Sequence, residues 1–486
     1  MRPSLVITVV LSYFVILIAI SLITSKKASS RTFFTADRKS PWYLVAFGMI
    51  GTSLSGVTFI SIPGWVGDTN FTYMQTVLGY LLGYFVIATV LMPLYYRLNL
   101  VSIYEYLEQR FGYWSYKSGA ACFLVSRTMG ASFRLLLVAG VLHTICKPFW
   151  DVPFWAYVFI TILLIWIYTF RGGIKTIVWT DTLQTALMLA AVTLVVYMIG
   201  ERMNLSLDGI FTAVSESKYA QVFEWDWKVK TNFFKNFFAG AFIAIVMTGL
   251  DQDMMQKNLT CKNIGEAQKN MFSFSVILVF VNILFLTLGA LLYLFAAQEN
   301  IAIPEKTDNL FPMIAAEYLD ESVGIIFLLG IIAAAYSSAD SALTALTTSF
   351  CVDFLGFEKG EDNATKKQTR IFIHISFSLI LFLVAVVYGA INNEAIIESV
   401  FKAAGYTYGP LLGLFSFGIL TKRPVVDKWV PLVCLASPAL CFVLNMFSTE
   451  ILWGYEFGFE ILIVNGLLTF LSLLLLSCNK NAYLRA

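Results

Sequence analysis

The apolar segment GIIAAAYSSADSALTALTTS, residues 330–349, carries three serines and one aspartate near its middle. Ala334, Ser337, Ser338 and Ser341 recur at steps of three and four residues, so they lie along one stripe of an α-helix. Oxygen ligands suit hard cations. The stripe therefore indicates a cation site. The structural alternative is that the serine hydroxyls bond back to carbonyls one turn earlier in the helix.

Two acidic residues strengthen the cation hypothesis. Asp340 lies within the same segment, and Asp181 ends the sequence RGGIKTIVWTD about one turn into another apolar segment. Ionisable residues inside membrane spans face a cavity or a partner and mark ion or substrate paths. Asp181 therefore predicts a nearby cation, with a salt bridge to Lys175 or Arg171 as the structural alternative.

The composition places these residues in a membrane protein. The chain has 486 residues, of which 58% are hydrophobic and 13% charged, and its mean hydropathy of +0.75 excludes an ordinary soluble globular domain. A spanning helix needs about 20 mainly apolar residues. Thirteen such segments are predicted, at about 4–24, 42–66, 73–96, 119–145, 153–170, 176–200, 233–254, 271–296, 323–349, 371–391, 396–420, 429–447 and 457–477.

Lys and Arg are distributed unevenly between the two sides of these spans. Lys26 and Lys27 directly follow the first span, whereas Glu299, Glu305 and Asp308 lie in a connection assigned to the opposite side. Because basic residues near span ends stay on the cytoplasmic side, we expect the N-terminus outside and the C-terminus inside. The chain is predicted to be a multi-pass protein of the plasma (inner) membrane.

The second span, GMIGTSLSGVTFISIPG over residues 48–64, has a composition that breaks helices. Glycine, serine and threonine occupy its middle, including Ser53, Ser55 and Thr58. Freed backbone carbonyls at membrane depth occur where they are buried in protein or line a cavity, and discontinuous helices offer such carbonyls to sodium in transporters. We therefore predict a broken helix, with close packing through small residues as the alternative.

Two arginines lie inside the fourth span, in the sequence LVSRTMGASFRLLL. Arg127 and Arg134 are seven residues apart and share one helix face. An arginine at this depth costs several kcal/mol and needs an anion, an acidic partner or water. The pair predicts an anionic substrate, unless one arginine instead pairs with Asp181, Asp340 or Glu398 to fix the helices.

Other charged residues have simpler interpretations. Glu398 and Lys402 are spaced for an i,i+4 ion pair. Asp251 and Gln252, near the inner end of the seventh span, are interpreted as a structural cap or gate rather than as substrate ligands.

Five sequence motifs together resemble the sodium:solute symporter family over nearly the whole chain. They are SLSGVTFISIPG, GGIKTIVWTD, GLDQDMMQKNL, AAYSSADS and AAGYTYGPLLGLFSFGILTKR. The resemblance implies an all-α protein with a LeuT-like core of two inverted five-helix repeats, spans 2–6 and 7–11. The single transporter domain, 1–486, would comprise an extra helix (4–24), the ten-helix core (42–420) and two C-terminal helices (429–477).

The resemblance also implies sodium sites. A first Na+ would take backbone ligands from Gly51 and Leu54 and ligands from Ala334, Ser337 and Ser338 of the serine helix. Bacterial sialic acid symporters in the family have a second site, whose positions correspond here to Asp181, Ser337, Asp340 and Ser341. This chain departs from those members at Asp340, where they have serine, and the acid could strengthen the site, carry a proton or pair with a base.

The substrate site is expected beside the broken span. In the sialic acid symporters a span-4 arginine holds the substrate carboxylate, and Arg127 is assigned to that position, with Phe71 and Gln75 as the neighbouring aromatic and amide. The predicted substrate ligands are Ser53, Ser55, Thr58, Phe71, Gln75 and Arg127.

We therefore expect a sodium-coupled symporter that imports a small organic carboxylate, such as sialic acid or a monocarboxylate. It is expected to bind at least one Na+, and the motifs favour two. The alternative is a sugar, polyol or amino-acid symporter with structural arginines. A membrane sensor is a second class, and an enzyme is disfavoured because no His, Cys or metal constellation is evident. The expected partners are the solute and the lipid bilayer, without nucleic acid or an obligate protein partner.

Overall fold

A computed structural model describes residues 3–24, 38–147, 150–357, 364–391 and 396–477, and the chain in these ranges is mainly helical. The basic residues Lys26 and Lys27 lie outside the described ranges. The principal helices are α1 (Pro3–Thr24), α3 (Trp42–Ser53), α4 (Gly56–Thr69), α5 (Tyr73–Val86), α6 (Met92–Leu98), α7 (Glu105–Arg110), α8 (Tyr113–Cys146), α9 (Phe154–Arg202), α10 (Leu207–Ser215), α11 (Phe233–Ala244), α12 (Gln252–Asn258), α13 (Ile264–Gln298), α15 (Glu321–Ser349), α16 (Ala364–Ile391), α17 (Ile396–Thr407), α18 (Gly409–Leu420), α19 (Val430–Met446), α20 (Ser448–Ile451) and α21 (Ile461–Leu475).

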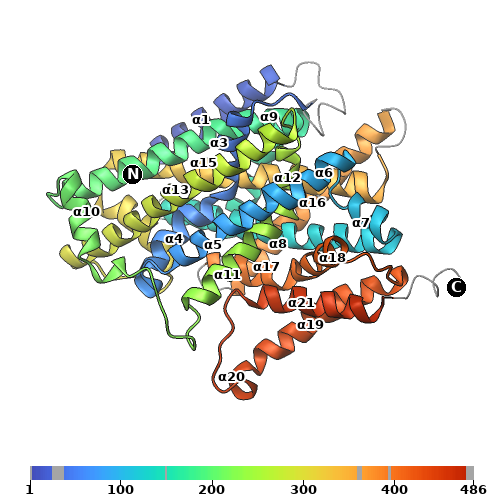
Figure 1. Cartoon of the computed structure of the whole chain (residues 1–486). Coiled ribbons are helices and arrows are strands. Elements are labelled where there is room, and N and C mark those ends of the chain that lie inside the picture. Colours follow the sequence, from blue (N-terminus) through green and yellow to red (C-terminus); the bar gives the residue numbers. More distant parts are fainter. Residues whose placement is uncertain (1–2, 25–37, 148–149, 358–363, 392–395, 478–486) are drawn as a thin grey trace, which may run out of the picture.

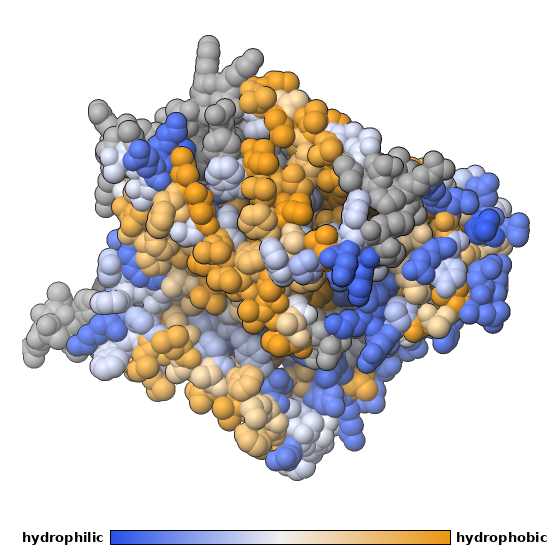
Figure 2. Space-filling model, turned by 180° about the vertical axis from the view of Figure 1, so that it is seen from behind, coloured by the Kyte–Doolittle hydropathy of each residue, from blue (hydrophilic) through white to orange (hydrophobic). Residues whose placement is uncertain are grey.

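Many of these helices have the length and composition of membrane spans. Among the described residues, seven helices are long and apolar enough to cross a bilayer, three further spans consist of bent helix pairs, and three shorter apolar helices accompany them. Figure 2 shows an apolar band across one face of the molecule, with hydrophilic residues gathered on either side of it. The protein is a multi-pass membrane protein, while the number of thirteen spans stays a prediction.

The second span is broken, as its composition predicted. Helix α3 ends at Ser53, α4 begins at Gly56, and the two are inclined by 53°. Ser55 caps α4, since its side chain accepts a hydrogen bond from the Val57 backbone N–H at 3.3 Å. Two other spans bend in the same way, between α11 and α12 by 70° and between α17 and α18 by 47°.

Helix α15 occupies the interior of the bundle, where it packs against α9, α8, α4 and α3 (Figure 1). All of its residues from Gly330 to Ser349 are buried, including the serine stripe. Helix α1 packs on α9 and α15, whereas α18, α19 and α21 pack together at another edge of the molecule. The predicted cation stripe is thus enclosed by protein rather than by lipid.

The contact between α5 and α11 depends on glycine. A Cβ atom on Gly79 would lie 2.0 Å from the Phe237 carbonyl oxygen, and one on Gly240 would lie 2.2 Å from the Thr76 carbonyl oxygen. The obstacle in each case is backbone, which cannot rotate away. Small residues at membrane helix contacts permit this close approach.

We expect Gly240→Ala to destabilise the protein by about 3 kcal/mol, because the added methyl group must force two helix backbones apart. The measurement is thermal unfolding of the purified protein in detergent. The matched control is Gly140→Ala on α8, where an added Cβ meets no atom within 4 Å. Equal melting temperatures for the two variants would contradict the packing argument.

Candidate sodium and substrate site

The broken end of α3 meets the serine stripe of α15. The Ser338 hydroxyl lies 3.4 Å from the carbonyl oxygen of Thr52 on α3 and 3.4 Å from that of Ala334 on its own helix. A Cβ atom on Gly51 would lie 3.4 Å from the Ser337 hydroxyl and 2.2 Å from the Thr185 hydroxyl of α9. Glycine at position 51 therefore allows α3 to approach both α9 and α15.

The oxygen atoms at this junction suit sodium. Leu54 leaves the helical conformation, with φ −89° and ψ 79°, so the last carbonyls of α3 lack a following helical turn. These carbonyls and the α15 hydroxyls are oxygen donors of the kind that hard cations prefer. The first predicted site fits this arrangement, and its ligands Gly51, Leu54, Ala334, Ser337 and Ser338 stay a prediction.

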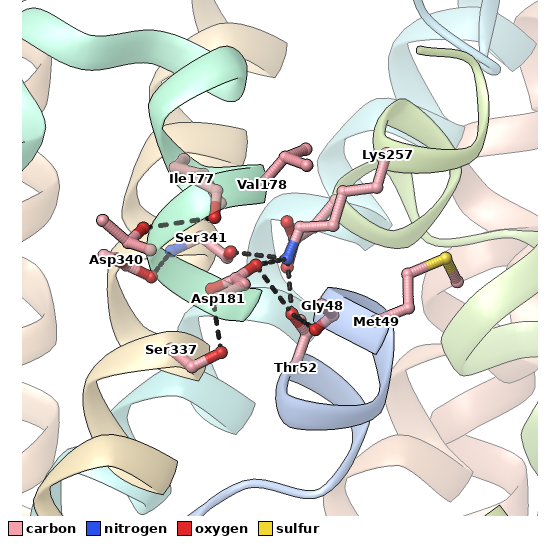
Figure 3. Close-up of polar contacts among 12 residues, drawn as sticks. Gly48, Met49, Thr52, Ile177, Val178, Asp181, Lys257, Ser337, Asp340 and Ser341 are labelled. Atoms are coloured by element: carbon pink, nitrogen blue, oxygen red, sulfur yellow. Dashed lines mark hydrogen bonds and ion pairs between the residues drawn. The ribbon is translucent and has the colours of Figure 1, made fainter. Parts of the chain in front are cut away.

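Beside this junction, the predicted second sodium site contains a lysine ammonium group (Figure 3). Lys257 Nζ lies 2.7 Å from Asp181 Oδ2 and donates hydrogen bonds to the hydroxyls of Ser341, at 2.7 Å, and Thr52. The Ser337 hydroxyl donates to Asp181 Oδ1 at 2.8 Å. The described charged partner of Asp181 is therefore Lys257, which neither sequence interpretation named, while the side chains of Lys175 and Arg171 lie outside what the structure describes.

Asp340 does not join this cluster. Its Oδ1 accepts a hydrogen bond from the Ser341 backbone N–H at 2.6 Å. In Figure 3 its carboxylate points toward Ile177, on the side of α9 away from the Lys257 ammonium. Of the four predicted ligands of a second sodium, the structure brings together Asp181, Ser337 and Ser341 around Lys257 and turns Asp340 away.

A cavity adjoins the broken span. Its wall includes the predicted ligands Ser53, Ser55 and Thr58, and both arginines of α8. Further lining residues from α5, α11, α13 and α17 are Tyr73, Tyr80, Tyr84, Ile243, Ala244, Leu278, Asn282, Ile397, Val400 and Phe401. The cavity is thus largely apolar and aromatic, with a few convergent polar groups, as is typical of small-molecule sites.

Arg127 pairs with two acidic residues at the break between α11 and α12. Its guanidinium forms an ion pair with Asp253 and lies 3.8 Å from Asp251 Oδ2. Asp251 also caps α12 through the Asp253 and Met254 N–H groups and accepts a hydrogen bond from the Tyr408 hydroxyl at 2.6 Å. This geometry matches the alternative interpretation of the sequence, in which an arginine fixes the helices. Its acidic partners, however, are not the predicted Asp181, Asp340 or Glu398.

Arg134 has a different environment. It is buried and lines the cavity, yet its Nε and Nη1 atoms have no hydrogen-bond partner among the described residues. The described ion pairs of the chain include none to Arg134. Arg134 thus differs from Arg127, whose Nε also lacks a described hydrogen-bond partner but whose guanidinium already faces two carboxylates.

Two other predicted substrate ligands lie away from the cavity wall. The side chain of Gln75 is buried and fully engaged, donating to the carbonyl of Thr231 at 2.8 Å and accepting from the backbone N–H of Glu224 at 3.2 Å. Phe71 is half-buried and does not line the cavity either. The expected i,i+4 pair is confirmed, with Lys402 Nζ 3.2 Å from Glu398 Oε1.

Sequence reasoning missed the roles of Lys257, Asp253 and Asn282. Lys257 follows the predicted seventh span, 233–254, and a lysine, like the arginines, needs a partner at membrane depth. The 70° bend between α11 and α12 carries it back toward α9 and α15. The signal was present in GLDQDMMQKNL, where two acids and a lysine follow an apolar run.

Comparisons with known proteins identify the family of this chain. The family model described as the sodium:solute symporter family matches residues 33–426. The chain belongs to this family. It is accordingly a sodium-coupled transporter and not an enzyme.

Relatives of this symporter include the sodium/sialic acid symporter NanT of Aliivibrio fischeri, 28% identical over 82% of this chain and 79% of NanT. The sodium/sialic acid symporter SiaT of Proteus mirabilis is 24% identical over 85% of this chain and 84% of SiaT. A solved substrate-bound, outward-open Na+-coupled sialic acid symporter has a similar fold, with a TM-score of 0.82 at 20% identity over 97% of both chains. Mhp1, a nucleobase-cation symporter, has a TM-score of 0.53 at 13% identity over 90% of this chain and 92% of its own, which supports the LeuT-like architecture.

We expect Arg127→Met to lower stability by about 3–5 kcal/mol, because it leaves Asp253 and Asp251 buried without their cation. The double variant Arg127→Met with Asp253→Asn should recover part of this loss. Thermal unfolding in detergent measures both. A single variant as stable as the parent would show that the ion pair does not hold α8 to α12.

Proposed function

We propose that this symporter imports a sugar acid of the sialic acid type together with Na+. The observation that carries the proposal is the buried Arg134 guanidinium, which lines the cavity with two donors unpaired among the described residues. The relatives NanT and SiaT are both sodium/sialic acid symporters, which supports the same substrate class here.

A carboxylate would resolve the electrostatic problem at Arg134. A buried guanidinium without a counterion is costly, and a carboxylate accepts two parallel N–H···O bonds from its planar fork. Arg127 is already neutralised by Asp253 and Asp251, so a second anion beside it would meet repulsion. We therefore assign the carboxylate to Arg134 in place of the earlier candidate Arg127.

The rest of the cavity favours a substrate with several hydroxyl groups over a short monocarboxylate. Ser55 and Thr58 lie on the broken span, and the phenols Tyr73, Tyr80 and Tyr84 line the wall. A further lining residue, Asn282, has an Oδ1 atom without a hydrogen-bond partner among the described residues. Tyr73 and Tyr80 hydrogen-bond to each other at 3.0 Å, and such hydroxyls can also pair with sugar hydroxyls, whereas a small aliphatic acid would leave Asn282 Oδ1 unpaired.

Sodium and substrate would be coupled through the break between α3 and α4. The predicted sodium ligands Gly51 and Leu54 are at the end of α3, and Ser53 and Ser55 beside them line the cavity. Na+ bound to those carbonyls would order the break and pre-position the substrate ligands. By linkage, substrate then raises the affinity for Na+ by the same factor.

The transport cycle follows as alternating access. Na+ and substrate bind from outside, the cavity closes, and rocking of the core releases both to the cytoplasm. This direction assumes the predicted placement of the N-terminus outside and of the protein in the plasma membrane. The neutral alternative, a sugar, polyol or amino-acid symporter, would leave the Arg134 guanidinium unpaired in the loaded state.

We expect Arg134→Ala to raise KM for sialic acid uptake about 100-fold or more, because a charged hydrogen-bonded pair is lost. Arg134→Lys should recover only part of this, since lysine lacks the bidentate fork. The measurement is uptake of labelled N-acetylneuraminic acid into proteoliposomes, with lactate and glucose compared in parallel. Uptake of glucose alone, or an unchanged KM in Arg134→Ala, would contradict the assignment.

We expect Ser338→Ala to raise the Na+ concentration for half-maximal uptake about tenfold, because one hydroxyl ligand of the cation is removed. The matched control is Thr348→Ala, which deletes a buried hydroxyl on the same helix, without a described partner, well beyond the α3 contact. Sodium titration of uptake separates the two variants. Identical sodium curves would remove Ser338 from the site.

A further inference from the structure

We infer that Lys257 is a tethered cation that takes the place of a second Na+, so that the symporter binds one sodium per cycle. The inference rests on the sodium-coupled transport proposed above and goes beyond it by setting the number of ions. It concerns a cluster formed by four separate elements, α3, α9, α12 and α15.

The cluster has the composition of a cation site. Asp181 supplies a carboxylate, and Thr52, Ser337 and Ser341 supply hydroxyl oxygens. The side chains of Asp181, Ser337 and Ser341 are at most 1% exposed, and Thr52 is 2% exposed. A carboxyl group this deep in the protein stays ionised only with a positive charge at close range.

Lys257 fulfils that requirement completely. An ammonium group has three N–H donors and no acceptor. The three donors are directed to Asp181 Oδ2, the Ser341 hydroxyl and the Thr52 hydroxyl (Figure 3). Lys257 is itself only 1% exposed, so bulk water does not share this role.

The same oxygens cannot hold Na+ as well. A sodium ion bound to Asp181 and Ser341 would lie about 4 Å or less from the ammonium nitrogen, because both cations would share ligands. At the effective dielectric constant of a protein, two like charges at that distance repel enough to weaken binding about a thousandfold. Occupancy by Lys257 therefore excludes the second ion.

The first sodium site is not blocked in this way. Its candidate carbonyls at the end of α3 and the Ser338 hydroxyl form no hydrogen bond to Lys257. Ser337 connects the two regions, since it donates to the Asp181 oxygen opposite the lysine. The fixed positive charge of Lys257 thus takes over the neutralisation of Asp181, and one mobile Na+ remains.

The test counts bound sodium in the absence of any organic substrate. We expect the purified full-length protein to bind one ²²Na+ per chain with a Hill coefficient near 1. Lys257→Ala frees the oxygens and removes the cation that neutralises Asp181, so this variant should bind two Na+ per chain. Its melting temperature should also become more sensitive to Na+ than that of the parent. Lys257→Ala combined with Asp181→Asn should return to one.

The control is Lys235→Ala, which removes a buried lysine from α11 of the same broken span, where it donates to the Glu456 carbonyl at 3.1 Å and faces the Tyr455 ring. It should leave the count at one. A parent that binds two Na+, or a folded Lys257→Ala variant that still binds one, overturns the inference. If Lys257→Ala does not fold, the count in the parent decides alone.

Failure of the proposed substrate would be visible separately. Sodium binding without substrate does not depend on which solute is carried, so absence of sialic acid uptake leaves the sodium count readable. Conversely, two bound sodium ions would reject the role of Lys257 while leaving the Arg134 assignment intact.

Discussion

Neutralisation of buried charge at short range organises the centre of this protein. Asp181 and Lys257 are both almost completely buried, and each would be prohibitively costly alone in a low-dielectric interior. Their contact requires α12 to turn back toward α9, which the 70° bend after α11 makes possible. The same principle fixes Arg127 against Asp253 and Asp251. The break between α11 and α12 therefore brings the buried charges close enough to form ion pairs.

The number of mobile ions decides how strongly such a transporter can concentrate its substrate. One Na+ with a monovalent anion carries no net charge, so a tenfold sodium gradient supplies roughly 1.4 kcal/mol and about tenfold accumulation. A second Na+ would add the same amount again and about 2.3 kcal/mol for each 100 mV. A symporter in which a lysine replaces the second Na+ lacks this additional driving force. In return, neutralisation of Asp181 no longer depends on the external sodium concentration. The contact among α3, α9 and α15 is also stabilised for as long as the Asp181–Lys257 ion pair is formed.

The sequence predicted the parts of the site that arise from local composition. The serine stripe of α15 is visible as a helical spacing, and the break after Ser53 follows from a run of small residues. Pairing between distant charges was not predictable in the same way. Arg127 and Arg134 share one face of α8, and only the direction of α12 decides which of them meets Asp253. The same holds for Lys257, whose sequence position near a span end concealed its return to the centre.

Two of the three bent spans meet beside Arg127 of α8. Tyr408, at the break between α17 and α18, donates to Asp251, at the break between α11 and α12, and Arg127 of α8 lies beside the same carboxylate. Tyr73 and Phe401, which also line the cavity, approach each other with ring centroids 6.4 Å apart. The first contact is directional and charge-assisted, whereas the second is an apolar contact that can slide. Separating Tyr73 from Phe401 would cost an apolar contact, whereas separating Tyr408 from Asp251 would leave a buried carboxylate with one partner fewer. The break between α17 and α18 is therefore held more firmly to the break between α11 and α12 than Phe401 is held to Tyr73.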